Sequence, residues 1–257
     1  LERVFEGSRK PKVDRRDLVA LALSAAVWVG LLAMPLILVL VRAFEVRGSF
    51  GFENFGNLGT RGARDLLNIT FIDAAANSLR NMAVAALIAF VLGTLISWLL
   101  TRTRFRSLDL LFLVPLGVSS VVLGFGFLVS FDASWFPLRS SWLIVPLAQA
   151  LIALPMVIRL VHPALVSIGK EPIEQAQLDG ATSWQSWRFI ESRMIRGVLL
   201  TSLGFAAIIS IGEFGASSFL ANGSQATIPT LLYRLISRPG DQNYGMAMAV
   251  SAILIVL

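Results

Sequence analysis

Residues 82–100 read MAVAALIAFVLGTLISWLL, an apolar run that contains no charged side chain. An α-helix needs about 20 mostly apolar residues to cross the hydrocarbon core of a bilayer. Backbone amide and carbonyl groups without partners are costly in hydrocarbon, so the run is expected to be helical. The stretch therefore predicts a transmembrane helix, and the rest of the chain decides how many accompany it.

Similar runs recur along the whole chain. Six spans are expected: Leu18–Val41, Met82–Leu100, Leu110–Phe131, Trp142–Val161, Gly197–Leu220 and a last one that begins near Tyr244. The predicted fold class is therefore an all-α polytopic membrane protein with six transmembrane helices. Residues 1–17 are expected to form a basic cytoplasmic tail or linker, and residues 18–257 the transmembrane domain. Since the chain starts at Leu1 and stops at Leu257 inside an apolar run, we expect it to be a piece of a longer protein.

Composition supports this class. The chain is 56% hydrophobic and only 15% charged, whereas a soluble domain carries about 25% charged residues. The net charge of +6 would suggest nucleic acid as a partner of a soluble protein. Here the basic residues flank apolar runs, so membrane orientation explains them and no nucleic-acid partner is expected. The absence of cysteine excludes disulfides and thiolate metal sites.

Basic residues also predict the orientation. They gather in the N-terminal tail and in the second and fourth connections, which lie on one side of a six-span protein. The positive-inside tendency places that side, and the N-terminus, in the cytoplasm. The residues are Arg3, Arg9, Lys10, Lys12, Arg15, Arg16, Arg102, Arg104, Arg106, Lys170, Arg188, Arg193 and Arg196.

The fourth connection, residues 167–196, is too polar to span a membrane. Pro172 is tolerated in the first turn of a helix and predicts a start there. Gly180 is expected to end that helix, and Ser183 to cap a second one. Trp184 and Trp187 follow helical spacing in the second helix. The segment is therefore predicted to present two short amphipathic helices with a glycine joint to the cytoplasm.

Within this segment, Glu174-Gln175-Ala176, then Gly180, then Ile190 resembles the EAA motif of binding-protein-dependent, type I ABC importer permeases. In that family the pattern is Glu-Ala-Ala, three residues, Gly, nine residues, Ile, one residue, Leu-Pro. Gln175 replaces an alanine, and Ser192-Arg193 replaces the closing Leu-Pro. Two further stretches, residues 211–216 and 227–233, resemble the subfamily that imports iron(III) or thiamine. Polyamine permeases are close to it.

The resemblance implies a mechanical role. Residues 18–257 would be the permease domain, and the EAA-like helix would couple it to cytoplasmic ABC ATPase subunits. The other implied partners are an extracytoplasmic solute-binding protein, a second permease half (fused or separate) and lipid of the bacterial inner membrane. No G-x-x-x-x-G-K-[ST] pattern occurs, so this chain is expected to bind no cofactor, while its partner uses ATP. It is therefore not expected to be an enzyme.

Polar residues inside the spans are candidates for the translocation path. Glu213 is an ionisable group at membrane depth, which is a functional candidate by default. Its structural alternative is pairing with Arg234 or Arg238, or a position close to the wet interface. Ser119, Ser120 and Gln149 either face the path or bond to a neighbouring helix. His162, the lone histidine, is expected to snorkel or cap a helix, and no metal site is predicted.

Two other classes of protein compete with the importer. A secondary carrier would use Glu213 as its coupling carboxylate, and residues 167–196 would be a mere connector. An intramembrane enzyme would need a Ser/His pair or paired carboxylates at membrane depth, and the sequence shows neither. A carrier would need no ATPase and would respond to ionophores, which separates it from the importer.

Overall fold

The computed structural model describes residues 14–257 except 47, 64–66, 103–113, 115–116, 132–140 and 222. The longer helices are α1 (Arg15–Phe44), α3 (Phe71–Arg102), α6 (Ile144–Ser167), α10 (Arg196–Gly212) and α13 (Asp241–Val256). Shorter helices are α2 (Glu53–Gly56), α5 (Ser120–Ser130), α7 (Glu171–Leu178), α8 (Ser183–Ser186), α9 (Ser192–Met194), α11 (Gly215–Leu220) and α12 (Ile228–Ile236). The remaining elements are the 3-10 turns η2 (Asn57–Gly59) and η6 (Gly223–Gln225), the π-helix η5 (Trp187–Glu191), and the antiparallel pair β1 (Glu45–Val46) and β2 (Ser49–Phe50).

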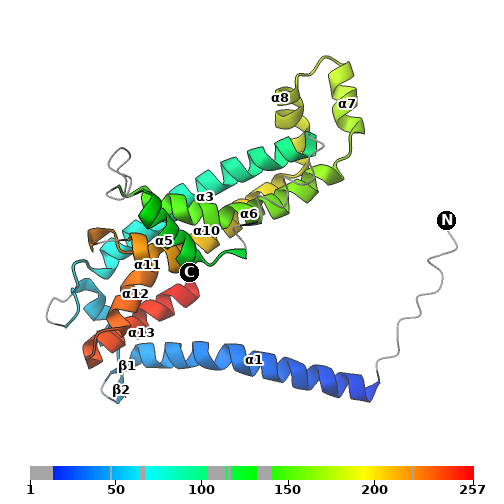
Figure 1. Ribbon diagram of the computed structural model, residues 1–257. Helices are drawn as coiled ribbons and strands as arrows, with labels where there is room; N and C mark the ends of the chain where they lie inside the picture. The colour runs from blue at the N-terminus through cyan, green and yellow to red at the C-terminus, as the bar shows by residue number, and fades with distance from the viewer. Residues whose placement is uncertain are drawn as a thin grey trace.

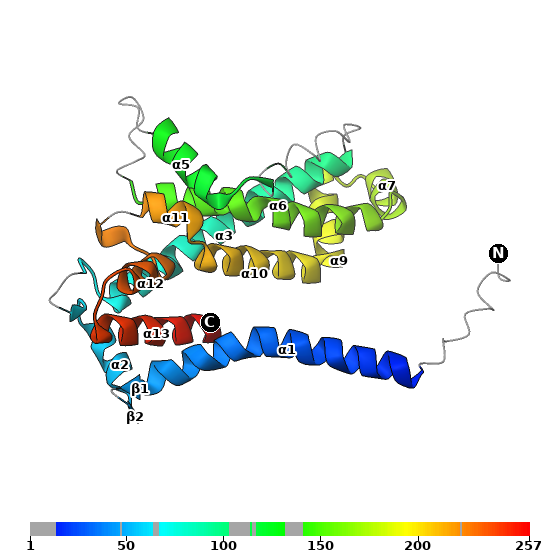
Figure 2. The ribbon, with the colours of Figure 1, turned by 60° about the horizontal axis from the view of Figure 1, so that its bottom comes forward.

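Helices α3, α6 and α10 pack together as the central bundle (Figure 2). Their contact is lined by small side chains such as Ala89, Ala153 and Ala206, none of which is exposed. At Gly93 an added Cβ would lie 2.7 Å from Cγ1 of Val157, so only glycine fits. Because lipid is as apolar as a protein interior, close van der Waals contact between small residues holds such helices together.

A second core lies at the other end of the molecule from α7 and α8 (Figure 1). It buries Leu231 and Leu235 of α12 against Met246 and Val250 of α13. Ala43 at the end of α1 joins it, and the nearby Asn54 side chain donates to the carbonyl oxygens of Ala43 and Glu45 at 3.0 Å each. These bonds fix the turn after α1 to α2.

Helix α1 meets the rest of the chain along α13 and then runs free (Figure 2). Its start is capped by Asp14, whose backbone amide in turn donates to the side chain of Asp17, a capping box. Most of its apolar side chains are exposed, Leu31 to 71%. An apolar surface of this extent is satisfied by lipid or by another membrane helix.

The expectation of six spans is met only in part. Within the described residues, α1, α3 and α6 are long and apolar enough to cross a membrane, and α10 makes a fourth if it is joined to residues 183–194 across an 80° bend. The expected third span is represented by α5, which has 11 residues, and its expected start at Leu110 lies outside the described residues. The sixth is α13, with 16 residues up to the end of the chain.

The expected fifth span, Gly197–Leu220, is not one helix. It ends at Gly212 and a new helix, α11, begins at Gly215. Glu213 between them has an extended backbone, with φ −70° and ψ 120°. Hydropathy is continuous across this point, so the prediction of one unbroken helix was wrong there. The break forms because the Glu213 side chain accepts hydrogen bonds from backbone amides of α11, which an unbroken helix would bond to its own carbonyl groups.

Candidate functional site

Helix α7 carries the EAA-like residues. It begins at Glu171, has Pro172 in its first turn as predicted, and has Glu171 and Glu174 near its positive end. It ends at Leu178, and Gly180, the residue after its C-cap Asp179, has a φ of +90° in the left-handed region that glycine favours. The amide of Gly180 donates to the Gln177 carbonyl at 3.0 Å, and that of Ala181 donates to the Ala176 carbonyl at 2.9 Å. This pair of bonds is a Schellman end, which closes the helix firmly.

The faces of α7 are open. No residue of the helix is buried, and Glu174 and Gln175 are exposed while Ala176 is half-buried. Leu178 is 88% exposed, so it offers an apolar contact to a partner. Figure 1 shows α7 and α8 standing out from one end of the helix bundle. The helix therefore projects from the bundle with its surface available to a partner.

The second helix of this segment starts one residue earlier than predicted. Thr182, not Ser183, is the N-cap: its side chain accepts from the Gln185 amide at 3.3 Å, and Gln185 Oε1 accepts from the Thr182 amide at 2.7 Å. This reciprocal pair is a capping box. The helix then widens into the π-turn η5, where Ile190 is half-buried, and the chain bends by 80° before α10.

The residues predicted for the path come together around the break in the fifth span. Glu213 is buried, with Oε1 accepting from the Ala216 amide at 2.7 Å and Oε2 from the Ser217 amide at 3.0 Å. The Ser217 hydroxyl also donates to Oε2 at 2.8 Å, and Gln149 Nε2 donates to that hydroxyl at 3.2 Å. Oε1 of Gln149 is buried without a hydrogen-bond partner. The cluster therefore links α6 to α11 through one serine.

The two serines of α5 differ. Ser120 is half-buried and lies against Gly215, where its Oγ would clash with any added Cβ. Ser119 is exposed and precedes α5 as its N-cap, so it lies just outside the described helix. Ser217 was missed by the sequence reasoning, although its position one helical turn after Glu213 is a readable signal.

Glu213 does not form the ion pair with Arg234 that was considered as its structural alternative. The guanidinium of Arg234 donates to the carbonyl oxygens of Ala221 at 3.1 Å and Gly223 at 3.5 Å. His162 lies with Nδ1 3.5 Å from the Ser97 carbonyl oxygen, within the bundle. Among the described residues, no group of three or more His, Asp or Glu side chains is placed to hold a metal ion.

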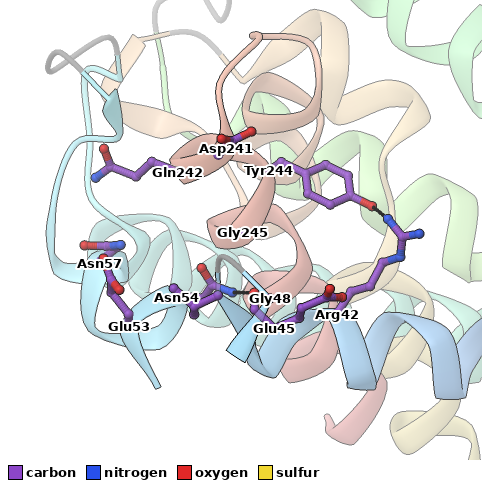
Figure 3. Close-up of a pocket in the computed structure, with 11 residues that line it drawn as sticks. Arg42, Glu45, Gly48, Glu53, Asn54, Asn57, Asp241, Gln242, Tyr244 and Gly245 are labelled. Carbon is purple, nitrogen blue, oxygen red and sulfur yellow. Dashed lines mark hydrogen bonds between the residues drawn. The ribbon is translucent and has the colours of Figure 1, made fainter. Parts of the chain in front are cut away.

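A polar pocket of about 420 Å³ opens near the start of α13. Figure 3 shows Arg42 of α1 meeting the Tyr244 hydroxyl at one side of it, through a hydrogen bond of 2.8 Å. Glu45, Glu53 and Asp241 give the rest of the rim acidic character. The pocket and α7 therefore lie at opposite ends of the molecule (Figure 1).

Comparisons with known proteins agree on one architecture. Residues 90–257 match the family described as the inner membrane component of binding-protein-dependent transport systems. The chain is 31% identical to the molybdenum transport system permease protein ModB of Haemophilus influenzae over 72% of this chain and 88% of that protein. It is 28% identical to the sulfate transport system permease protein CysT of Escherichia coli over 74% and 73%. The structure of a bacterial ABC transporter involved in the import of the acidic polysaccharide alginate superposes with a TM-score of 0.70 at 21% identity, over 93% of this chain and 90% of that one.

Proposed function

Because the chain belongs to the family of inner membrane components of binding-protein-dependent transport systems, we propose that α7 is the helix through which an ATPase drives it. As a member, the chain is a permease subunit of an ABC importer and is not itself an enzyme. The readings as a secondary carrier and as an intramembrane enzyme are thereby set aside. Three things remain to be assigned: the contact through which the ATPase moves the permease, the path of the solute, and the identity of the solute.

The observation that supports the coupling role is that α7 is exposed and that a Schellman pair of hydrogen bonds closes its C-terminal end. Glu174 and Gln175 point to solvent, Ala176 leaves room for close approach, and the Schellman end at Gly180 fixes the direction in which the chain leaves. A short amphipathic helix of this kind docks into a groove of a partner. ATP bound and hydrolysed by a pair of ATPase subunits would then move α7 as a lever, and this chain itself would bind no cofactor. Ile190 lies in the π-turn that follows and belongs to the lever.

The other partners follow from the two ends of the molecule. The start of α1 points toward the end that carries α7, so a cytoplasmic α7 places the N-terminus in the cytoplasm (Figures 1 and 2). The opposite end, with the Arg42–Tyr244 pocket, then faces the extracytoplasmic binding protein. The exposed apolar surface of α1 is left for lipid and for a second permease half, fused or separate.

The proposed path runs beside the cluster of Ser120, Gln149 and Ser217. Neutral amide and hydroxyl groups exchange hydrogen bonds with a passing solute without trapping it, unlike a fixed charge. Both carboxylate oxygens of Glu213 are already occupied, so its role in the path is to hold the break between α10 and α11. Ser119 lies at the exposed edge of this region.

The proposed solute is a small inorganic oxyanion of the sulfate kind. Support comes from the relatives, which are named as sulfate and molybdenum permeases. The iron(III) or thiamine expected from residues 211–216 and 227–233 finds no support in these relatives, and both remain competitors in the test below, together with spermidine.

The test is ATP hydrolysis by the reconstituted importer. The chain, with its co-purifying ATPase, second half and binding protein, is placed in proteoliposomes, and sulfate, molybdate, iron(III), thiamine or spermidine is added in turn. Stimulation by sulfate or molybdate supports the oxyanion proposal, and stimulation only by another solute overturns it. A cysteine at Gln175, in a chain without native cysteines, should cross-link to the ATPase; a failure to cross-link would count against α7 as the coupling helix.

A further inference from the structure

An ion pair joins the coupling segment to a helix that is distant in the sequence. Nη2 of Arg102, the last residue of α3, lies 2.8 Å from Oε2 of Glu191, the last residue of the π-turn η5. The Glu191 side chain is only 2% exposed and that of Arg102 is 29% exposed. A nearly buried carboxylate therefore has its charge balanced by a side chain that reaches it from the half-exposed end of another helix.

The arginine is held in place on its own helix. Its guanidinium stacks over the ring of Trp98, one turn earlier in α3, with Cζ 4.1 Å from the ring centroid. An arginine fixed between an aromatic face and a carboxylate has little rotational freedom left. The pair is thus a rigid link and not a mobile surface contact.

The link and α7 share a pocket. Its volume is about 360 Å³, and it is lined by Arg102 and Glu191 together with Lys170, Ile173, Glu174 and Gln177 at the start and along the length of α7. In the chain, η5 follows α8 and precedes the 80° bend into α10. Covalent connection carries movement of the α7–α8 unit into α6, through residues 168–170, and into α10. The ion pair adds a direct attachment of that unit to α3.

We propose that Arg102 and Glu191 are positioning residues that transmit movement of α7 to α3, so that α3 and α10 move together with the coupling helix. This rests on the proposed coupling role of α7. The physical reason is that separating the pair would leave the Glu191 carboxylate buried and unpaired, which is strongly unfavourable. π-turns within helices are frequent at functional sites, and the pair holds the end of this one in place. When α7 is displaced, α3 follows because the link does not open.

The test measures whether α7 and α3 move as one body. Spin labels are attached at Glu171→Cys in α7 and Leu87→Cys, an exposed position of α3, in the assembled transporter. The distance between them is compared in the nucleotide-free state and in the state trapped with ATP and vanadate. In the otherwise unchanged protein we expect one narrow distance that is the same in both states. In Glu191→Gln we expect a broader distribution and a difference between states of about 2 Å or more, the scale of helix shifts in switching proteins.

Control variants separate the proposal from a general structural effect. Arg188→Gln, an exposed arginine of the same turn, should keep the narrow distance. The exchanged pair Arg102→Glu/Glu191→Arg should recover it. If Glu191→Gln does not assemble with the ATPase, Arg102→Gln breaks the same link from its half-exposed side. An unchanged distance in the variant that assembles overturns the proposal. If the Gln175 cross-link to the ATPase forms in that same experiment, the coupling role of α7 survives and only the link to α3 is refuted.

Discussion

The hydroxyl of Ser217 donates a 2.8 Å hydrogen bond to the carboxylate of Glu213, one helical turn before it. The same carboxylate accepts the backbone amides of Ala216 and Ser217, so a charged group in a membrane segment is used as a helix cap. This explains why α11 starts where it does, since three donors converge on one side chain. The break in the fifth span is therefore built into the local sequence.

Replacing Glu213 should lower stability more than it lowers transport. Glu213→Ala leaves the three donors without an acceptor in a buried site, and each unsatisfied group costs about 1–3 kcal/mol. Glu213→Gln keeps one oxygen and should lose less. The measurement is the thermal unfolding midpoint of the purified protein in detergent, beside solute uptake. Ser218→Ala, which loses only a bond to the Gly215 carbonyl within its own helix, is the matched control. A normal midpoint with uptake abolished in Glu213→Gln would instead make the carboxylate part of the path.

Gly124 should be far less replaceable than Gly126 in the same helix. A Cβ at Gly124 would lie 2.5 Å from the Ala216 Cα, so α5 and α11 would have to separate. Overpacking of this kind costs about 1–3 kcal/mol. No atom lies within 4 Å of the corresponding position at Gly126, so Gly126→Ala should be neutral or slightly stabilising. Unfolding midpoints of the two variants, compared in one detergent, check this. Equal midpoints would show that the contact between α5 and α11 is looser than described.

Local signals account for most of the coupling segment. Pro172 and Gly180 predicted the start and end of α7, because proline suits a first turn and glycine suits the left-handed exit. The cap of the next helix was misplaced at Ser183, although Thr182 with Gln185 three residues later has the pattern of a capping box. The N-cap preference for Ser and Thr was a sound basis for the prediction, but it was applied to the hydroxyl of Ser183 instead of that of Thr182.

What depends on distant residues was not predictable from one sequence. Nothing near Gln149 indicates that Ser217 would be its partner, 68 residues away. The link of Arg102 to Glu191 spans 89 residues. Hydropathy likewise places apolar runs but carries no information on a side chain that competes with the helix ladder, as Glu213 does. The length of the apolar runs therefore predicted the class of fold, while the three-dimensional arrangement assembled the candidate site.

Changing the end of α7 should uncouple ATP hydrolysis from uptake. Gly180→Pro forces φ to about −65° at a residue whose φ is +90°, and it removes the amide that closes the helix. Uptake should fall to background while the assembled complex still hydrolyses ATP, and Glu174→Lys should act in the same direction. Gly180→Asn, which tolerates the left-handed region, should retain most of the coupling. Uptake and hydrolysis measured together in proteoliposomes give the ratio; an unaltered ratio in both Gly180→Pro and Glu174→Lys would refute the role of α7.

Gln149 should become accessible to water only in part of the transport cycle. Its side chain is 2% exposed, yet its Oε1 has no hydrogen-bond partner. An unsatisfied buried oxygen is rare in folded proteins and is explained if another state of the cycle hydrates it. Because the chain has no cysteine, Gln149→Cys can be labelled alone with a membrane-impermeant thiol reagent. We expect slow labelling in the resting protein and labelling at least about tenfold faster in the ATP–vanadate state, the effect of a population shift of about 1.4 kcal/mol. Ser119→Cys, at an exposed position, should label quickly in both states and controls for reagent access. Equal, slow labelling of Gln149→Cys in every state would place this side chain outside the path and leave its hydrogen bond to Ser217 as a purely structural link between α6 and α11.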